Sequence, residues 1–147
     1  MPITATRYHD FSAGHRVVGH ESRCAFLHGH NYRVHFTCQA EELDAVGRVL
    51  DFSAIKSRLC EWLEDNWDHK FLAWEKDDEF KELDMHSAEG VRVLRDSVVW
   101  VPFNPTAENM AEHLLRVIGP QQLAGTGVRL IVVRIDETRK CSADAVI

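Results

Sequence analysis

The sequence predicts an α+β fold in which an antiparallel sheet packs against two helices on one face. Segments that alternate apolar and polar residues, as strands do, occur at 3–11, 28–38 and 128–135. Two segments carry apolar residues at three- and four-residue steps, as helices do, at 52–67 and 104–118. Because the order is strand, strand, helix, helix, strand, with no regular alternation of strand and helix, antiparallel pairing is expected.

Composition limits the classes of function. The chain has 147 residues with 45% apolar and 27% charged residues, which suits one globular domain spanning 1–147. The formal charge of −6 gives no basic footprint for nucleic acid, and no apolar run approaches a membrane span. The amino terminus lacks the apolar stretch of a signal peptide, and the cysteines form no CxxC pair. We therefore expect a cytoplasmic protein without nucleic-acid or membrane partners. The cysteines are Cys24, Cys38, Cys60 and Cys141.

The first two strands come early in the chain. Residues 3–11 alternate imperfectly, and Gly14 and Gly19 loosen the segment that follows. From His28 onward the alternation is clean. Tyr32, Val34, Phe36 and Cys38 form one side of this second strand, and Asn31, Arg33, His35 and Thr37 form the other. His28 and His30 thus start the second strand on the side of its apolar face.

The two helices have recognisable starts. Residues 41–47 are polar and predict a turn, after which Asp51 or Ser53 can cap a helix that runs to about Trp67. For the second helix, Asn104 can be the cap with Pro105 at the first helical position, or Thr106 can cap it. Gly119-Pro120 is expected to end this helix. The apolar faces are Phe52, Ile55, Leu59, Trp62, Leu63 and Trp67 in the first helix, and Ala107, Met110, Ala111, Leu114, Leu115 and Ile118 in the second.

The strongest strand, 128–135, is followed by Asp136-Glu137-Thr138. A fourth strand is expected either after Glu137 or in the short apolar run 98–101. The stretch 70–104 shows the weakest pattern of the chain.

Two histidines separated by one glycine could together bind a metal ion. Residues i and i+2 of a strand point to the same face, so His28 and His30 present two imidazoles side by side. His15 could add a third. Three neutral nitrogens with an open fourth position are the pattern of catalytic zinc sites. The alternative is that the histidines are solvated strand and loop residues.

Three other positions could carry chemistry. Cys24 could be a fourth metal ligand, a base or nucleophile, or an inert buried thiol. Asp68 could orient His69 as a proton relay, although on its own the pair is better explained by a cationic histidine at a helix end. Glu137 could pair with an amidine-like edge such as that of a pterin, or could be a solvated strand end.

Taken together, the motifs resemble the signature blocks of the 6-pyruvoyl-tetrahydropterin synthase family. The blocks occur in the order of the family and span nearly the whole chain. The resemblance is greatest to the bacterial branch, the 6-carboxy-5,6,7,8-tetrahydropterin synthases of queuosine synthesis. The blocks are Phe11-Ser12-Ala13-Gly14-His15-Arg16, Cys24 with His28-Gly29-His30-Asn31-Tyr32, Val49-Leu50-Asp51-Phe52, Asp68-His69, Pro105-Thr106-Ala107-Glu108-Asn109 and Glu137-Thr138.

The resemblance implies a tunnelling fold (T-fold), a four-stranded antiparallel sheet with two helices on one face. Such sheets join into a barrel in trimers, often stacked as hexamers, with active sites between subunits. The metal is then zinc on His15, His28 and His30. The substrate is 7,8-dihydroneopterin triphosphate, converted to 6-carboxy-5,6,7,8-tetrahydropterin with release of acetaldehyde and triphosphate.

The resemblance also implies a role for each remaining site residue. Cys24 accepts a proton, and Asp68 with His69 forms the relay. Glu137 anchors the pterin, with Thr106 also at the substrate, and Glu137 can join the relay. The alternatives are the 6-pyruvoyl product, formed without side-chain cleavage, and a non-catalytic pterin-binding module that zinc stabilises.

One departure from the family concerns the segment 70–104. It is about twenty residues longer than expected for the compact bacterial enzymes. It directly follows the expected relay, so it could cover the site, extend a subunit contact or alter the product. The acidic balance of the chain requires local cations for a triphosphate, and Arg16, Arg23 and Lys70 are the candidates.

Overall fold

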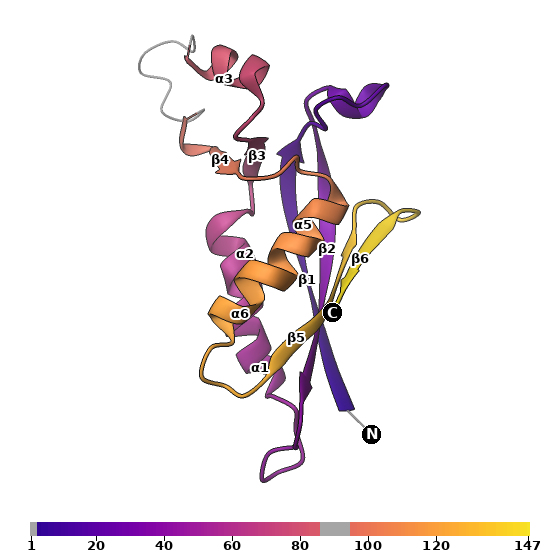
Figure 1. The fold of residues 1–147 in the computed structure, drawn as a ribbon, viewed down its shortest axis with the longest axis vertical. Coiled ribbons are helices and arrows are strands. Elements are labelled where there is room, and N and C mark those ends of the chain that lie inside the picture. The colour runs from indigo at the N-terminus through magenta and orange to yellow at the C-terminus, as the bar shows by residue number, and fades with distance from the viewer. Residues whose placement is uncertain (1–2, 86–94) are drawn as a thin grey trace.

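The computed structural model describes residues 3–85 and 95–147, and its centre is a curled sheet (Figure 1). In the described part of the chain the sheet has six strands in the order β4-β3-β1-β2-β5-β6. The two longest strands, β1 and β2, pair along their whole length and lie in the middle. The strands are β1 (Ile3–His15), β2 (His28–Ala40), β3 (Lys70–Trp74), β4 (Val98–Val101), β5 (Arg129–Asp136) and β6 (Ser142–Val146).

The expected four-stranded antiparallel sheet is present as β1, β2, β5 and β6. Both candidates for a fourth strand are strands, because β6 follows Glu137 and β4 is the run 98–101. The sheet also continues beyond β1 with β3 and β4, which pair in parallel. We did not predict β3, because it is only five residues long and its residues Lys70 to Trp74 do not alternate.

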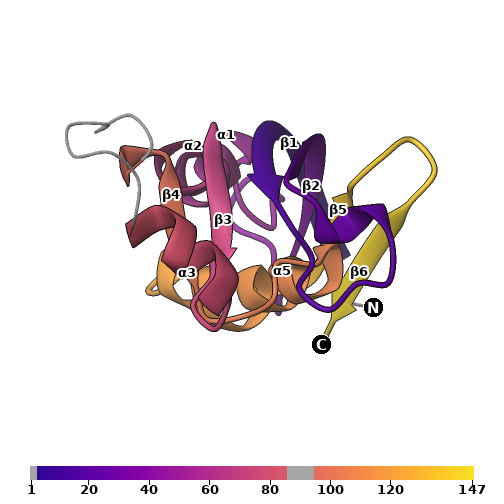
Figure 2. The same cartoon turned by 90° about the horizontal axis from the view of Figure 1, so that it is seen from above.

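Two long helices lie on one face of the sheet (Figures 1 and 2). The first consists of α1 (Phe52–Ile55), a wide π-helical turn (Lys56–Cys60) and α2 (Glu61–Asn66). The second consists of α5 (Ala107–His113), a π-helical turn (Leu114–Ile118) and α6 (Gly119–Gln122). A short helix, α3 (Asp78–Met85), and a 3₁₀ turn (Arg23–Ala25) lie outside this layer.

The helix caps are those that the sequence allowed. The Asp51 carboxylate accepts the backbone N–H of Ser53 at 2.8 Å, and the Thr106 hydroxyl accepts that of Asn109 at 3.1 Å. Asn104, the other candidate cap, has a different use described below. None of the helices in residues 3–85 and 95–147 is both long and apolar enough to span a membrane.

The core lies between the sheet and the two helices. Alternate residues of β1 and β2 are buried there, and the intervening residues face the opposite side of the sheet. The largest buried side chains are Trp67, Tyr32, Phe36, Ile55, Leu59, Leu63, Leu72, Met110, Leu114, Leu115 and Ile135. This face also carries the inward-pointing residues at the ends of the strands.

Two of the expected boundaries were wrong. β1 does not end at Phe11 but continues through Gly14 to His15, because it stays paired with β2 as far as His28. The second helix does not end at Gly119-Pro120 but runs on to Gln122. Pro120 lies in the first turn of α6, just after a π-helical turn that ends at Ile118, and a residue that cannot donate a helical hydrogen bond is tolerated at such a position.

The segment 70–104 docks on the sheet next to the end of β1. Arg16 Nε donates to Asp77 Oδ2 at 2.8 Å, and Asp77 is only 3% exposed. Asn104 bonds both the N–H and the carbonyl of Val18, at 3.0 and 2.9 Å. The segment therefore holds the chain just after His15 from two directions. Residues 86–94 of this segment lie outside the described residues.

The Arg16–Asp77 pair supports a stability prediction. We expect Asp77→Asn to lower the free energy of unfolding by about 3 kcal/mol, because it leaves a partly buried guanidinium without its buried partner. Denaturant unfolding followed by circular dichroism measures this loss. Asparagine keeps the shape of the side chain, so the variant isolates the charge.

Glu79→Gln is the matched control. Glu79 bonds the same guanidinium at 3.2 Å but is 82% exposed, so water screens its charge. The control should unfold at nearly the wild-type denaturant concentration. Equal losses in the two variants would show that burial of Asp77 does not matter.

Candidate functional site

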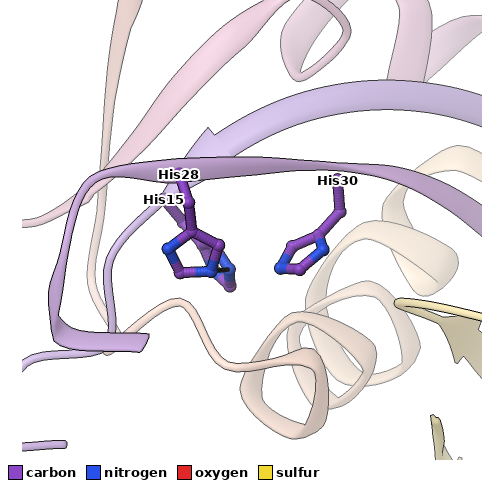
Figure 3. Close-up of side chains that lie close together, drawn as sticks. All are labelled: His15, His28 and His30. Atoms are coloured by element: carbon purple, nitrogen blue, oxygen red, sulfur yellow. Dashed lines mark hydrogen bonds between the residues drawn. The ribbon is translucent and has the colours of Figure 1, made fainter. Parts of the chain in front are cut away.

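Three imidazoles converge at one end of the β1–β2 pair (Figure 3). His15 is the last residue of β1 and lies directly opposite His28, the first residue of β2. His30 follows two residues later on the same face, beside Ala13. One nitrogen of each ring lies within 4.8 Å of the others, and this is the group of three that could hold a metal ion in the described part of the chain. The spacing predicted that His28 and His30 lie side by side, and the family resemblance implied that His15 joins them.

The hydrogen bonds on the outer ring nitrogens fix the tautomers. His15 Nδ1 lies 2.5 Å from the carbonyl oxygen of Pro105, and His28 Nδ1 lies 2.7 Å from that of Phe26. A carbonyl oxygen only accepts, so each Nδ1 carries the hydrogen. In the neutral rings the two Nε2 atoms are then lone-pair donors. They lie 3.1 Å apart and cannot bond each other in this state.

The inner nitrogens fit a cation. Two facing lone pairs repel unless a positive centre lies between them. The 3.1 Å between the two Nε2 atoms is close to the separation of about 3.3 Å between two nitrogen ligands of a tetrahedral zinc ion. His30 Nε2 is buried and has no hydrogen-bond partner among the described residues. Carbonyl groups behind ligating imidazoles are also what metal sites use to orient them. The three residues therefore suit a divalent metal such as zinc.

Burial keeps these rings neutral. Burial lowers the pKa of His15 to about 4, an effect that neighbouring imidazolium charge on His28 or His30 would increase and that the Pro105 carbonyl partly opposes. Burial also lowers the pKa of His30, although the Glu137 carboxylate works in the opposite direction. At neutral pH both rings are in the form that binds a metal.

Glu137 faces the histidines. Its Oε1 lies 3.4 Å from His30 Nε2 and 3.5 Å from His15 Nε2. The side chain comes from the turn between β5 and β6. A carboxylate in this place can accept a proton or neutralise charge beside the imidazoles.

Cys24 lies in the 3₁₀ turn of the loop between β1 and β2. The turn is tied to the end of β1, because the Cys24 carbonyl accepts the N–H of Val17 at 2.7 Å. The thiol is partly buried and does not belong to the group that could hold a metal.

Asp68 and His69 are in contact at the junction of α2 and β3. Asp68 Oδ1 accepts the N–H of Ser12 and a ring hydrogen from His69 Nδ1, both at 3.0 Å. Burial alone would raise the pKa of Asp68, but these two hydrogen bonds outweigh it and hold the pKa below its usual value. His69 has a φ of +59°, and its N–H donates to the Ser12 carbonyl at 2.7 Å.

The relay pair is separate from the three histidines. The His69 ring is 83% exposed, and within the described residues no hydrogen bond or ion pair joins Asp68 or His69 to His15, His28 or His30. The pair is held at Ser12 of β1, three residues before His15, so the relay pair and the three histidines are near each other along this strand but are not in contact.

Asp68, His69 and Glu137 line an open cleft of about 940 Å³, which also contains residues that sequence reasoning missed. Arg139 and Lys140 line it, as does Tyr32, whose side chain is buried. The position of Tyr32 could have been found from the alternation that continues from His28 and His30. The other residues lining the cleft are Asp10, Phe11, Ser12, Asn31, Arg33, Asp68, His69, Arg134, Asp136, Glu137, Thr138, Cys141 and Ser142.

Two of the expected triphosphate cations have other partners. Arg16 pairs with Asp77 and Glu79, and Lys70 Nζ donates to the carbonyl of Asp96 at 2.7 Å. Arg23, the third, is exposed in the loop that carries Cys24. Thr106, expected at the substrate, uses its hydroxyl to cap α5.

Comparison with known proteins gives consistent matches. The chain matches the 6-pyruvoyl tetrahydropterin synthase family model over residues 4–146. It is 35% identical over 140 residues to the 6-carboxy-5,6,7,8-tetrahydropterin synthase of Rickettsia typhi, covering 95% of this chain and 96% of that one. The enzyme of the same name from Haemophilus influenzae is 29% identical over 124 residues, with 82% and 85% covered.

Two solved structures share the fold. An uncharacterized protein from Wolinella succinogenes superimposes with a TM-score of 0.85 at 24% identity, covering 99% of this chain and 98% of that one. The 6-pyruvoyl tetrahydropterin synthase of Caenorhabditis elegans gives 0.68 at 23% identity, covering 100% and 96%.

The low pKa of His15 predicts a pH dependence in metal-free protein. The unfolded state takes up the proton near pH 6.5, whereas the folded state resists it down to about pH 4. Stability is therefore complete above pH 6.5 and falls as the pH drops toward 4, by up to about 3 kcal/mol. Denaturant unfolding in the presence of EDTA across this range measures the loss.

His15→Gln should flatten this part of the profile, because it removes the titrating ring. His20→Gln, at a loop position, is the control and should keep the wild-type slope. The same slope in His15→Gln and in the wild type would contradict the prediction.

Proposed function

Because this chain belongs to the 6-pyruvoyl tetrahydropterin synthase family, we propose that it converts 7,8-dihydroneopterin triphosphate to 6-carboxy-5,6,7,8-tetrahydropterin, with release of acetaldehyde and triphosphate. The proposal rests on one observation above the others. One ring nitrogen from each of three histidines converges beside a carboxylate, in a chain 35% identical to a 6-carboxy-5,6,7,8-tetrahydropterin synthase. This reaction belongs to the synthesis of queuosine.

We propose zinc on His15, His28 and His30. When bound, the metal supplies a Lewis acid for the oxygens of the substrate side chain. The carbonyls of Pro105 and Phe26 hold the His15 and His28 rings in the tautomer that leaves Nε2 free.

The proton transfers fall to side chains around the histidines. Cys24 takes a proton from the substrate side chain. Asp68 keeps His69 oriented through the 3.0 Å contact, so that His69 can move protons between positions. The Glu137 carboxylate lies 3.4 Å from His30, which favours a part in this relay over a role confined to anchoring the pterin.

We further propose that the active site is completed between subunits of a trimer or hexamer. The exposed His69 ring and the partly buried Cys24 carry no bond to the three histidines within the described residues. A neighbouring copy could supply the missing half of each site. In this single-domain T-fold assembly, the segment 70–104 would brace the chain around His15 through Arg16 and Asn104.

Two alternatives remain distinct in their chemistry. Elimination of triphosphate without side-chain cleavage would give the 6-pyruvoyl product. A zinc-stabilised module would bind a pterin without turnover, with Cys24 as a fourth ligand. The position of Cys24 outside the metal-capable group favours the enzyme over the module.

The product assay tests the proposal directly. Purified protein loaded with zinc is incubated with 7,8-dihydroneopterin triphosphate, and the pterin is identified by mass spectrometry. We expect 6-carboxy-5,6,7,8-tetrahydropterin and one acetaldehyde for each turnover. A 6-pyruvoyl pterin without acetaldehyde would overturn the proposal in favour of the sister reaction, and binding without product would favour the module.

Substitution separates the metal ligands from the thiol. We expect one zinc ion per chain in the wild type and almost none in His28→Ala, because two imidazoles and no third bind the ion weakly. Cys24→Ala should keep its zinc and its melting temperature but lose turnover. Metal analysis with calorimetry measures both. Loss of zinc together with stability in Cys24→Ala would identify a closed structural site instead.

A further inference from the structure

The turn between β5 and β6 presents two cationic side chains beside the functional site. Glu137, at the start of this turn, has its Oε1 3.4 Å from His30 Nε2. Arg139 follows two residues later, so its Cα lies no more than about 7 Å from that of Glu137, and Lys140 comes next. All three residues of the turn line the open cleft of about 940 Å³. The two cations therefore lie on the same short segment as the carboxylate that faces the histidines.

Hydrogen bonds inside the turn fix its backbone. The Cys141 carbonyl accepts the N–H groups of Glu137 and Thr138, at 3.0 and 3.3 Å. The Thr138 hydroxyl accepts those of Lys140 and Cys141, at 3.2 and 3.1 Å. Because these bonds use only backbone atoms and the threonine hydroxyl, the side chains of Arg139 and Lys140 take no part in holding the turn. Their charges can be removed without removing a bond that the turn needs.

The other cationic side chains that line the cleft already have partners. Arg33 donates two hydrogen bonds to the Asp10 carboxylate. Arg134 donates one to the Asp136 carboxylate. The carboxylate of the relay pair accepts hydrogen bonds from its own histidine and from the backbone. Within the described residues no ion pair engages the two cations of the turn, so an anion can bind them without breaking one.

The chemistry of the two side chains indicates an anion with several charged oxygens. A planar guanidinium next to an ammonium suits phosphate oxygens, since one binds two-pronged and the other acts as a point charge. The chain as a whole carries a formal charge of −6, so a strongly negative ligand needs local cations to be held. The proposed substrate has its triphosphate at the end of the side chain that lies against the histidines. This triphosphate is the part of the substrate whose charge matches the turn.

We propose that Arg139 and Lys140 bind the triphosphate of the substrate. The inference rests on the proposed function and adds specificity to it, because the site then selects the triphosphate ester over 7,8-dihydroneopterin itself. Both side chains keep their protons and act by binding and orienting the anion. Since the triphosphate is bound before any bond of the substrate changes, loss of the cations should appear in KM rather than in kcat.

The test is the double variant Arg139→Gln/Lys140→Gln, which removes both charges and keeps polar side chains. In zinc-loaded protein we expect KM for 7,8-dihydroneopterin triphosphate to rise about 30-fold, with kcat changed less than about threefold. The inhibition constant of 7,8-dihydroneopterin, which has no phosphate, should keep its wild-type value. The melting temperature should also be unchanged. Arg139→Lys, which retains a cation, should keep KM within about threefold of the wild type.

The matched control is Arg129→Gln/Lys56→Gln, which makes the same change in net charge. Both side chains are exposed, lie outside the cleft and have no ion pair in the described part of the chain. This control should keep the wild-type KM. Sodium chloride gives a second readout, because added salt should raise the KM of the wild type and of the control but have little effect on that of the double variant.

The comparison decides the role of the turn even where the proposed function fails. If the wild type forms no pterin product, calorimetry gives the Kd of 7,8-dihydroneopterin triphosphate and of 7,8-dihydroneopterin, and the same differences are expected. Wild-type affinity for the triphosphate in the double variant would overturn the inference. An equal loss in the charge-matched control would do so too, since it would show an effect of net charge alone. Equal weakening of both ligands in the double variant would show that the turn shapes the pterin pocket and binds no phosphate.

Discussion

The register of β1 against β2 is the constraint on which the site depends. Pairing of His15 with His28 places two imidazoles next to each other, with ring centroids 4.6 Å apart, and the two-residue period of the strand adds His30 beside them. A slip by one residue would turn all inward side chains of one strand to the other face. The buried residues Phe11, Val34 and Phe36 prevent such a slip, because it would expose them. The same burial that stabilises the core therefore aligns the metal-binding nitrogens.

The register alone does not make the imidazoles useful ligands. Two carbonyls from separate parts of the chain, at Phe26 and Pro105, hold hydrogens on the outer nitrogens and leave the inner ones free. Pro105 is held close because Asn104 bonds Val18 and Thr106 caps α5. The helix start thus serves two purposes: it satisfies its own backbone and sets the tautomer of a histidine ninety positions earlier. Burial then keeps that ring neutral, because an imidazolium at this position would lose its hydration.

Local patterns in the sequence were sufficient for the central strands, both helices and the side-by-side placement of His28 and His30. Each of these follows from periodicity, whereas His15 and the Asp68–His69 pair were assigned only through the family resemblance. The features that were missed depend on contacts distant in sequence. β3 forms because the edge of β1 is open to it, and the helix passes Pro120 because this residue lies in the first turn of α6. No local signal connects Arg16 with Asp77, so Arg16 had the pattern of a free cation although it is paired.

That pairing changes how an anionic substrate can be accommodated by a chain of net charge −6. In the cleft, Arg33 donates two hydrogen bonds to the Asp10 carboxylate, and Arg134 donates one to the Asp136 carboxylate. Arg139 and Lys140 line the same cleft without an ion pair among the described residues. They lie on the turn that also carries Glu137, so they can be drawn to a phosphate group with no internal salt bridge to break. A triphosphate would thus be attracted by the turn between β5 and β6, while Arg33 and Arg134 of the sheet keep their carboxylate partners.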